Sequence, residues 1–151
     1  MAELFVEILG KPHGIIVFQL LAACRFTIYL SLIAFIGGGA VACLITLFRI
    51  SKNSSLQRLA ASFIWIFQSV PLLMLLFLIG LGLPRLLDIN IDPWTAATFA
   101  LVLFTSAYLA EVWRGAVESV AKGQWEASFA LNMEYSLLLR KVIIPQALKF
   151  G

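Results

Sequence analysis

The amino-acid sequence predicts an all-α membrane protein that crosses the bilayer about three times. Hydrophobic residues make up 62% of its 151 residues and charged residues only 13%, whereas a soluble domain has roughly 45 to 50% apolar residues. The mean hydropathy is +0.98. A soluble globule of this length could not bury so much apolar surface, but in a bilayer the lipid tails are as apolar as the side chains.

Three apolar windows are long enough to cross a bilayer. A helix rises about 1.5 Å per residue and the hydrocarbon core is about 30 Å thick, so one crossing needs about 20 apolar residues. The first window spans residues 26–48 without a charge, the second spans about 59–83, and the third runs from 94 to about 110 or slightly beyond. We therefore predict a three-span membrane region over residues 26–112.

The stretch before the first window is apolar but short. Residues 14–24 are too few to cross the bilayer alone. They either lie along the membrane interface or extend the first helix. We accordingly assign residues 1–25 to an external or interfacial N-terminal segment. Its first residues are acidic rather than basic, which does not match the pattern of a removable signal peptide.

The basic residues are distributed unevenly between the two sides of this region. Cytoplasmic loops of membrane proteins carry an excess of Lys and Arg. The excess predicts an external N-terminus and a cytoplasmic location for the segment after residue 112. One side holds eight basic residues, Arg49, Lys52, Arg58, Arg114, Lys122, Arg140, Lys141 and Lys149, and the other holds three, Lys11, Arg25 and Arg85.

Two windows contain residues that are unusual inside a membrane helix. In the first, glycines 37–39 either let another helix approach closely or form a flexible point in a moving helix. In the second, Pro71 removes a backbone donor and disturbs the preceding turn. The polar pair Gln68 and Ser69 lies directly before it. A polar group at this depth lines a solute pathway or bonds to another helix, and both alternatives are open for Gln68.

Residues 113–144 are too polar for the bilayer and too regularly patterned for an irregular loop. We predict that Gly123 ends one helix and that residues 124–131 form a short helix with Glu126 in its first turn. Asn132 would end this helix, because asparagine tolerates positive φ better than most residues. A second short helix then follows.

The apolar residues of this cytoplasmic segment need cover from water. They pack either on the membrane helices of the same chain or on a partner protein, and composition alone leaves both alternatives open. These residues are Trp125, Phe129, Leu131, Met133 and residues 137–139.

The same segment carries a recognisable motif. It reads Glu126, Ala127 and Ser128, then three residues, Asn132, nine residues, and Val-Ile-Ile-Pro at 142–145. This spacing resembles, without a gap, the EAA loop of binding-protein-dependent ABC importer permeases, which runs Glu-Ala-Ala, three, Gly, nine, Ile, one, Leu-Pro. The resemblance covers about residues 27–151.

The residues around the motif narrow the resemblance to the polar amino acid branch of that family. The second window also resembles this branch, which has a phenylalanine, a polar pair and a proline similar to residues 67–71. The flanking residues that match are Tyr108, Ala110, Glu111, Arg114, Gly115, Gly123 and Gln124 before the motif and Pro145, Gln146 and Ala147 at its end.

The resemblance implies a type I ABC importer transmembrane domain in the bacterial cytoplasmic (inner) membrane. It implies four partners besides lipid: a second permease subunit, identical or related; an external solute-binding protein; a polar amino acid as substrate; and a separate ATPase in the cytoplasm. The EAA loop, within residues 113–144, would form a coupling helix that docks on this ATPase. Its coupling residues would be Gly123, Gln124, Glu126, Ala127, Ser128, Ala130 and Asn132, and the pathway residues Gln68, Ser69 and Pro71.

The sequence departs from the family pattern at three positions. Ser128 replaces the second alanine of the motif, and this change keeps a small residue there. Asn132 replaces the glycine of the motif, and asparagine also suits a turn with positive φ. Gln68 stands where many members have arginine. A neutral amide offers hydrogen bonds but cannot hold a carboxylate by charge.

The family typically has five spans, of which two follow the EAA loop. We therefore expect this chain to hold about three of the five, with residues 145–151 beginning a truncated fourth. An alternative function follows from this length: a truncated or degenerate membrane subunit that binds the ATPase without transporting.

The sequence gives no support for an enzyme, a cofactor, a metal site or nucleic-acid binding. It contains no HExxH or GxSxG motif. His13 has no cysteine near it, and Cys24 and Cys43 have no metal-site spacing. We expect Glu111 to pair with Arg114 or a neighbouring loop rather than to act as a base. The basic residues are scattered between apolar runs and form no patch for nucleic acid.

Overall fold

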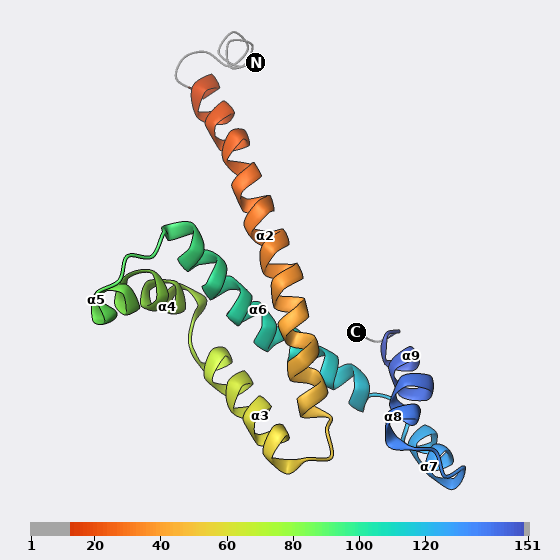
Figure 1. The fold of residues 1–151 in the computed structure, drawn as a ribbon. Helices are drawn as coiled ribbons and strands as arrows, with labels where there is room; N and C mark the ends of the chain where they lie inside the picture. The colour runs from red at the N-terminus through yellow and green to blue at the C-terminus, as the bar shows by residue number, and fades with distance from the viewer. Residues whose placement is uncertain (1–12, 150–151) are drawn as a thin grey trace.

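The computed structural model describes residues 13–149, which fold into helices and contain no strand (Figure 1). The all-α class is therefore confirmed. In chain order the elements are α2 (His13–Arg49), α3 (Ser54–Ser69), α4 (Leu72–Phe77), the π-helical turn η1 (Leu78–Gly82), α5 (Leu83–Leu87), α6 (Pro93–Glu118), α7 (Lys122–Ala130), α8 (Tyr135–Leu138), the π-helical turn η2 (Leu139–Ile143) and α9 (Ile144–Ala147).

Helix α2 is much longer than one crossing requires. It is continuous over 37 residues, about 55 Å at the usual rise. Residues 14–24 thus extend the first helix, which was one of the two alternatives above. The helix continues through residue 25, so the predicted boundary after that residue is not a helix end. The rest of the expected N-terminal segment, residues 1–12, lies outside the described part of the chain. Figure 1 shows the first half of α2 standing clear of the other helices.

The second window does not form one straight span. Helix α3 ends at Ser69, α4 begins at Leu72, and the axes of the two halves differ by 98°. The span predicted over 59–83 is therefore a broken one, and it counts as a crossing if its two halves are taken together. The break lies at Pro71, where the sequence predicts a disturbance, because this residue cannot donate a backbone hydrogen bond and keeps Val70 extended at φ −103°, ψ 125°. Two unbroken helices, α2 and α6, can span a membrane, and a third span exists if the bent pair is counted as one.

Two further prolines kink helices without ending them. Each π-helical turn stops two residues before a proline, η1 before Pro84 and η2 before Pro145. Proline lacks the N–H, and its ring clashes with the carbonyl four residues back. A wider π turn absorbs this conflict. The fourth span expected at residue 145 thus begins inside a helical run that starts at Tyr135.

Helix α6 has a well-defined start and extends beyond the predicted third span. A carboxylate oxygen of Asp92 accepts hydrogen bonds from the backbone N–H groups of Trp94 and Thr95, both at 3.1 Å, and Pro93 occupies the first turn. The helix then continues to Glu118, past the boundary at residue 112. The segments predicted to be transmembrane and cytoplasmic are therefore joined by one continuous helix.

Three buried clusters lie along α6, which contacts α2, α3, α4, η1 and α9 directly. The first joins it to α4 and η1, the second to α2 and α3, and the third, which we call the hairpin core, joins its last turns to α8, η2 and α9. Their buried residues are Leu75, Ile79, Ala96 and Ala100 in the first, Ala42, Ile45, Ala60, Ile64 and Ala110 in the second, and Ala116, Val117, Val120, Leu138, Ile143 and Ala147 in the hairpin core.

The glycines of α2 lie where this helix meets α6. A Cβ atom on Gly38 would approach the Cβ of Thr105 to 2.9 Å, and one on Gly37 would approach a methyl group of Val102 to 3.0 Å. These distances leave no room for a side chain at Gly38. The packing interpretation is confirmed for these two residues, whereas Gly39 has only an ordinary contact, 3.8 Å from Trp113.

We predict that Gly38→Ala lowers the free energy of unfolding by about 1 kcal/mol, because overpacking a tight contact costs about 1 to 3 kcal/mol and the gain in helix propensity, about 1 kcal/mol, offsets part of it. Gly39→Ala is the matched control and should leave stability equal or higher. Denaturant titration in detergent, followed by circular dichroism, measures both. Equal effects of the two substitutions would contradict the packing argument.

Candidate functional site

A helical hairpin over residues 119–149, which we call the cytoplasmic hairpin after its predicted location, begins directly after α6. Ser119 still donates its N–H to the carbonyl of Gly115 at 2.9 Å, and Ala121 then turns to an extended conformation that starts α7. Gly123 therefore lies inside the first turn of α7. It does not end the preceding helix, which contradicts the prediction above. Glu126 falls one residue beyond that first turn. Both predictions were wrong because α6 ends at Glu118 and α7 begins at Lys122, two residues before the predicted start. Val120, between the two helices, is buried in the hairpin core.

The end of α7 matches the prediction for Asn132. Its φ is +52°, and two reversed hydrogen bonds close the helix. The N–H of Asn132 donates to the carbonyl of Phe129 at 2.9 Å, and that of Met133 donates to the carbonyl of Ser128 at 3.1 Å. This is the Schellman pattern, which requires a left-handed residue at the position of Asn132.

Most of the predicted coupling residues lie on the exposed side of α7. Gly123, Gln124, Glu126, Ala127, Ala130 and Asn132 are exposed. Ser128 is the exception, because it is 4% exposed and its hydroxyl donates to the carbonyl of Gln124 at 2.7 Å. The serine thus fits where the motif has a small alanine, since its polar atom is satisfied within the helix.

The apolar residues of the hairpin divide between two environments. Trp125 and Met133 pack against the hairpin core, and Leu138 is fully buried in it. Phe129 and Leu131 remain 53% and 76% exposed. The chain's own helices therefore cover the inner side of the hairpin, while the apolar residues at the end of α7 lack cover from the described residues.

Tyr135 fastens the hairpin to the end of α2. Its hydroxyl donates to the carbonyl of Ile50 at 2.5 Å, across 85 positions of sequence, and the ammonium group of Lys52 lies 4.8 Å from the centre of its ring. Burial raises the pKa of the Tyr135 phenol above its ordinary value of 10.0. On the other side, Gln146 donates to the side-chain oxygen of Gln124 at 3.2 Å.

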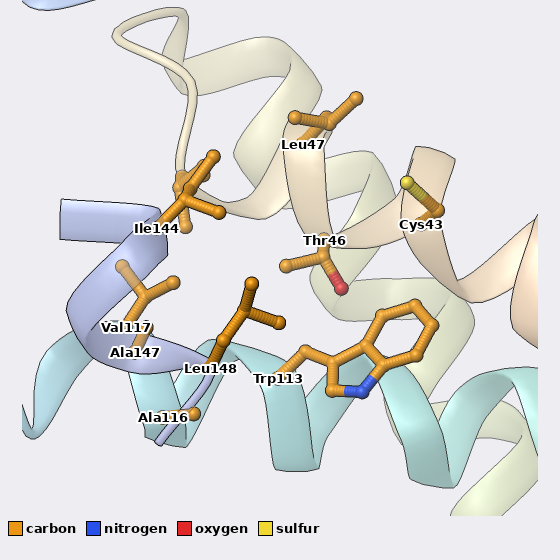
Figure 2. Close-up of a pocket in the computed structure, with 10 residues that line it drawn as sticks. Cys43, Thr46, Leu47, Trp113, Ala116, Val117, Ile144, Ala147 and Leu148 are labelled. Carbon is orange, nitrogen blue, oxygen red and sulfur yellow. The ribbon is translucent and has the colours of Figure 1, made fainter. Parts of the chain in front are cut away.

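An apolar cavity of about 330 Å³ separates α2 from the hairpin. Figure 2 shows its lining from α2, α6 and α9. Thr46 contributes a hydroxyl, which donates weakly to the carbonyl of Ala110 at 3.4 Å. The remaining labelled residues are Cys43, Leu47, Trp113, Ala116, Val117, Ile144, Ala147 and Leu148. Such a lining suits an apolar group and has few donors or acceptors for a polar solute.

A second, polar cavity lies between α2, α3 and α6. We call it the polar hollow. It measures about 470 Å³, and its lining residues are Arg49, Ala61, Ser62, Ile64, Trp65, Gln68 and Glu111. Charged and amide side chains of three helices thus meet inside the membrane region, where polar groups generally mark a solute pathway or an interhelical contact.

The three predicted pathway residues separate in the structure. Gln68 donates weakly to the carbonyl of Ala107 on α6, at 3.4 Å, which is the interhelical bond of the two alternatives above. Its side chain also lines the polar hollow, and its part in a solute pathway stays a prediction. The Ser69 hydroxyl donates back to the carbonyl of Trp65 at 2.6 Å. Pro71 forms the bend before α4. Neither Ser69 nor Pro71 lines the hollow.

Two ionisable residues complete the polar hollow. Glu111 accepts hydrogen bonds from Arg114, 3.1 Å from Nε to each carboxylate oxygen, which confirms the predicted pair, and Arg114 also pairs with Glu118. The Nε of Arg49 is buried and has no hydrogen-bond partner within residues 13–149. From the sequence, Arg49 was interpreted only as a charge that bounds the first apolar window. No local sequence pattern shows that the end of α2 meets α3 and α6.

The comparison with known families decides the assignment. A profile of the binding-protein-dependent transport system inner membrane component matches residues 34–150. The chain belongs to this family. This is the family that the EAA-like spacing predicted, and its members are transport components of the inner membrane rather than enzymes.

Curated relatives of the chain are amino-acid permeases. The nopaline transport system permease protein NocM of Agrobacterium fabrum (strain C58 / ATCC 33970) is 36% identical over 87% of this chain and 58% of its own length. The probable glutamine ABC transporter permease protein GlnM of Bacillus subtilis (strain 168) is 34% identical over 82% and 56%. The L-cystine transport system permease protein TcyB of the same organism is 35% identical over 82% and 53%. The chain thus spans a little over half the length of these relatives.

Solved structures agree with this assignment. A chain in the crystal structure of an amino acid ABC transporter with histidines matches with a TM-score of 0.81 and 33% identity, over 90% of this chain and 64% of its own. A chain of the inward-facing MetNI methionine ABC transporter matches with a TM-score of 0.63 at 24% identity, a likeness of fold alone. The predicted type I ABC importer permease fold is confirmed.

The Schellman end of α7 yields a prediction for this permease. Asn132→Val should lower the stability of α7 by about 1 to 2 kcal/mol, because a β-branched residue is strained at positive φ. Asn132→Gly should keep or raise it. Amide hydrogen exchange over residues 124–131 measures the local free energy of opening. Equal protection in both variants would show that the left-handed turn does not hold the helix end.

The Tyr135 contact yields a second prediction. Tyr135→Phe removes one hydrogen bond and should lower the free energy of unfolding by about 1 kcal/mol. Because the folded-state pKa of the phenol is raised, its contribution is complete below pH 10 and is lost as the pH rises through the folded pKa. Denaturant titrations at pH 8 and pH 11 should therefore show a larger loss for the wild type than for Tyr135→Phe. An identical loss would contradict this.

Proposed function

We propose that this chain is the transmembrane permease subunit of an ATP-driven ABC importer for polar amino acids, and that it couples to a separate cytoplasmic ATPase through α7. One observation carries the proposal. The residues that match the EAA motif form a short exposed helix whose opposite side is fixed to the end of α6 through the hairpin core. A helix presented in this way has a free face for a partner and a rigid connection to the membrane region.

The rigid connection gives the mechanism of coupling. A displacement of α7 by the ATPase would move α6 through the buried contacts of Val117 and Val120 with Leu138, since packed cores transmit displacement rather than absorbing it. The bond from Tyr135 to Ile50 would carry the same displacement to the end of α2. Closure of the ATPase pair would then rotate the helices between outward-facing and inward-facing states as rigid bodies.

The exposed end of α7 supports a protein partner at this place. Phe129 and Leu131 are large apolar residues left in contact with solvent beside the polar face of Glu126. A groove on the ATPase that receives α7 would cover both. In this proposal both alternatives for the hairpin hold: its inner side packs on the chain itself, and its outer side would take the partner.

The substrate class rests on the relatives and on the polar hollow. The matching permeases are named for glutamine, cystine and nopaline, and the hollow offers charged and amide groups to a polar solute. We further propose an external N-terminus, a second permease subunit of the same or a related sequence, and an external solute-binding protein that delivers the amino acid. The orientation is supported by the basic residues of the cytoplasmic hairpin, Lys122, Arg140, Lys141 and Lys149.

The coupling proposal is tested by capture of the ATPase. The full chain, purified in detergent, should retain the separate ATPase subunit of the importer, and Glu126→Lys should reduce the retained amount at least about tenfold, because it reverses a charge at the centre of the proposed docking face. Quantified pull-down measures this.

Glu134→Lys is the matched control for this test. It makes the same change of charge on the same hairpin, but its side chain lies beside Lys52 and Tyr135 in the groove next to α8 rather than on α7. The control should bind the ATPase as the wild type does. Capture that is absent in the wild type, or equal in wild type and Glu126→Lys, would disprove the assignment of α7.

A further inference from the structure

A groove of about 530 Å³ lies between α2 and α6. We call it the interhelical groove. Its wall on α2 runs from Phe26 to Phe35, and α6 contributes Leu101 and Thr105. It ends where the two helices close on each other, because a Cβ atom on Gly38 would lie only 2.9 Å from the Cβ of Thr105. Phe35 is 64% exposed, so the groove is open along its side.

The interhelical groove has the length of one leaflet of a bilayer. From Phe26 to Phe35 the helix axis advances about 14 Å, and half of the hydrocarbon core is about 15 Å thick. The Phe26 ring contacts the ring of Trp94 at the start of α6, with 5.3 Å between their centres. Tryptophan is typical of the interface between hydrocarbon and head groups. The groove therefore starts at the predicted membrane surface and ends near the bilayer midplane.

Arg25 places a positive charge at the start of this groove. Its guanidinium carbon lies 4.7 Å from the centre of the Phe26 ring, and the side chain is exposed. Within residues 13–149 no carboxylate pairs with it, since the ion pairs of this part of the chain belong to Arg114. Asp92 uses its carboxylate to cap the first turn of α6 instead. The charge of Arg25 is thus available to an anion at the membrane surface.

We propose that the interhelical groove binds one glycerophospholipid, with its phosphate held by Arg25 and one acyl chain lying between α2 and α6. An arginine fork fits a phosphate through parallel hydrogen bonds and also holds it by charge. The Thr27 hydroxyl lines the groove beside this charge and offers a donor to an ester carbonyl. The apolar residues further along, among them Leu30 and Leu101, suit the acyl chain.

The bound lipid would connect a part of α2 that has few neighbours to α6. The first half of α2 stands clear of the other helices (Figure 1), and its tight contacts with α6 begin only at Gly37. A lipid in the groove would fill the space before this contact. In the proposed orientation, with the N-terminus outside, the lipid belongs to the external leaflet.

The proposal is tested by titrating the full chain in detergent with lipid and counting bound molecules by native mass spectrometry. Phosphatidylglycerol should bind saturably. Diacylglycerol with the same acyl chains lacks the phosphate and should bind at least about tenfold more weakly, because it cannot accept the hydrogen bonds of a charged donor. Equal binding of the two lipids would overturn the proposal. Displacement of phosphatidylglycerol by inorganic phosphate would also overturn it, since the acyl chain would then contribute nothing.

Substitution of the arginine tests the phosphate contact. Arg25→Gln should weaken binding of phosphatidylglycerol at least about tenfold and leave that of diacylglycerol unchanged. Arg85→Gln is the matched control, because Arg85 is exposed, lies on the same predicted side of the membrane and does not line the groove. This control should bind as the wild type does. Equal weakening by both substitutions would show a general effect of charge and would contradict the site.

Substitution of Ser31 tests the position of the acyl chain. Ser31→Phe places a ring in the interhelical groove and should weaken binding of phosphatidylglycerol at least about tenfold, because the ring takes the volume of the chain. Leu32→Phe puts the same ring one residue further along α2, at an exposed position outside the groove, and should bind as the wild type does. Equal binding in these two variants would place the acyl chain elsewhere and overturn the proposal.

Other occupants of the groove would be recognised in the same spectra. A dimer in lipid-free detergent that Ser31→Phe dissociates, without Arg25-dependent lipid binding, would assign the groove to a second copy and overturn the lipid site. The site does not depend on coupling to the ATPase. A chain that binds phosphatidylglycerol through Arg25 but does not capture the ATPase would keep the site and disprove only the coupling, whereas the reverse result would remove only the site.

Discussion

The structure depends on how closely helices can approach α6. In lipid, helices gain no hydrophobic free energy from leaving the solvent, so they associate through van der Waals contact and hydrogen bonds between small residues. The buried residues of α6 are accordingly small, with Ala96, Ala100, Ala107 and Ala110 along its membrane part, and α2 meets it at glycine. Since the hairpin core sits on the last turns of the same helix, the placement of α7 follows from this packing as well.

The prolines divide the chain into rigid pieces in two different ways. At Pro71 the preceding residue is forced into an extended conformation and the helix breaks, so α4 can fold beside the start of α6. At Pro84 and Pro145 a π turn precedes the ring and the helix continues with a kink. The difference matters for coupling, because α8 to α9 stay one body and α3 and α4 do not.

Sequence reasoning succeeded where a local cause determines the structure. Composition fixed the all-α membrane class, the left-handed Asn132 followed from its side chain, and the tight contact of Gly38 followed from the behaviour of small residues in lipid. It failed where distant segments meet. The burial of Val120 depends on a core that it shares with Leu138, and the meeting of Arg49, Gln68 and Glu111 depends on three helices converging. The break at Pro71 was predicted from the sequence, but its angle of 98° was not.

The length of α2 has a mechanical consequence. Its contact with α6 at Gly38 lies near its cytoplasmic third, and about 25 residues, or about 37 Å, extend from there to its first described residue. The helix is therefore a lever with unequal arms. A rotation of about 10° at Gly38 would shift the short arm, which ends beside Tyr135, by about 3 Å and the far end by about 6 Å. In the proposed coupling, a small displacement at the end of α2 beside Tyr135 would become about twice as large at its far end.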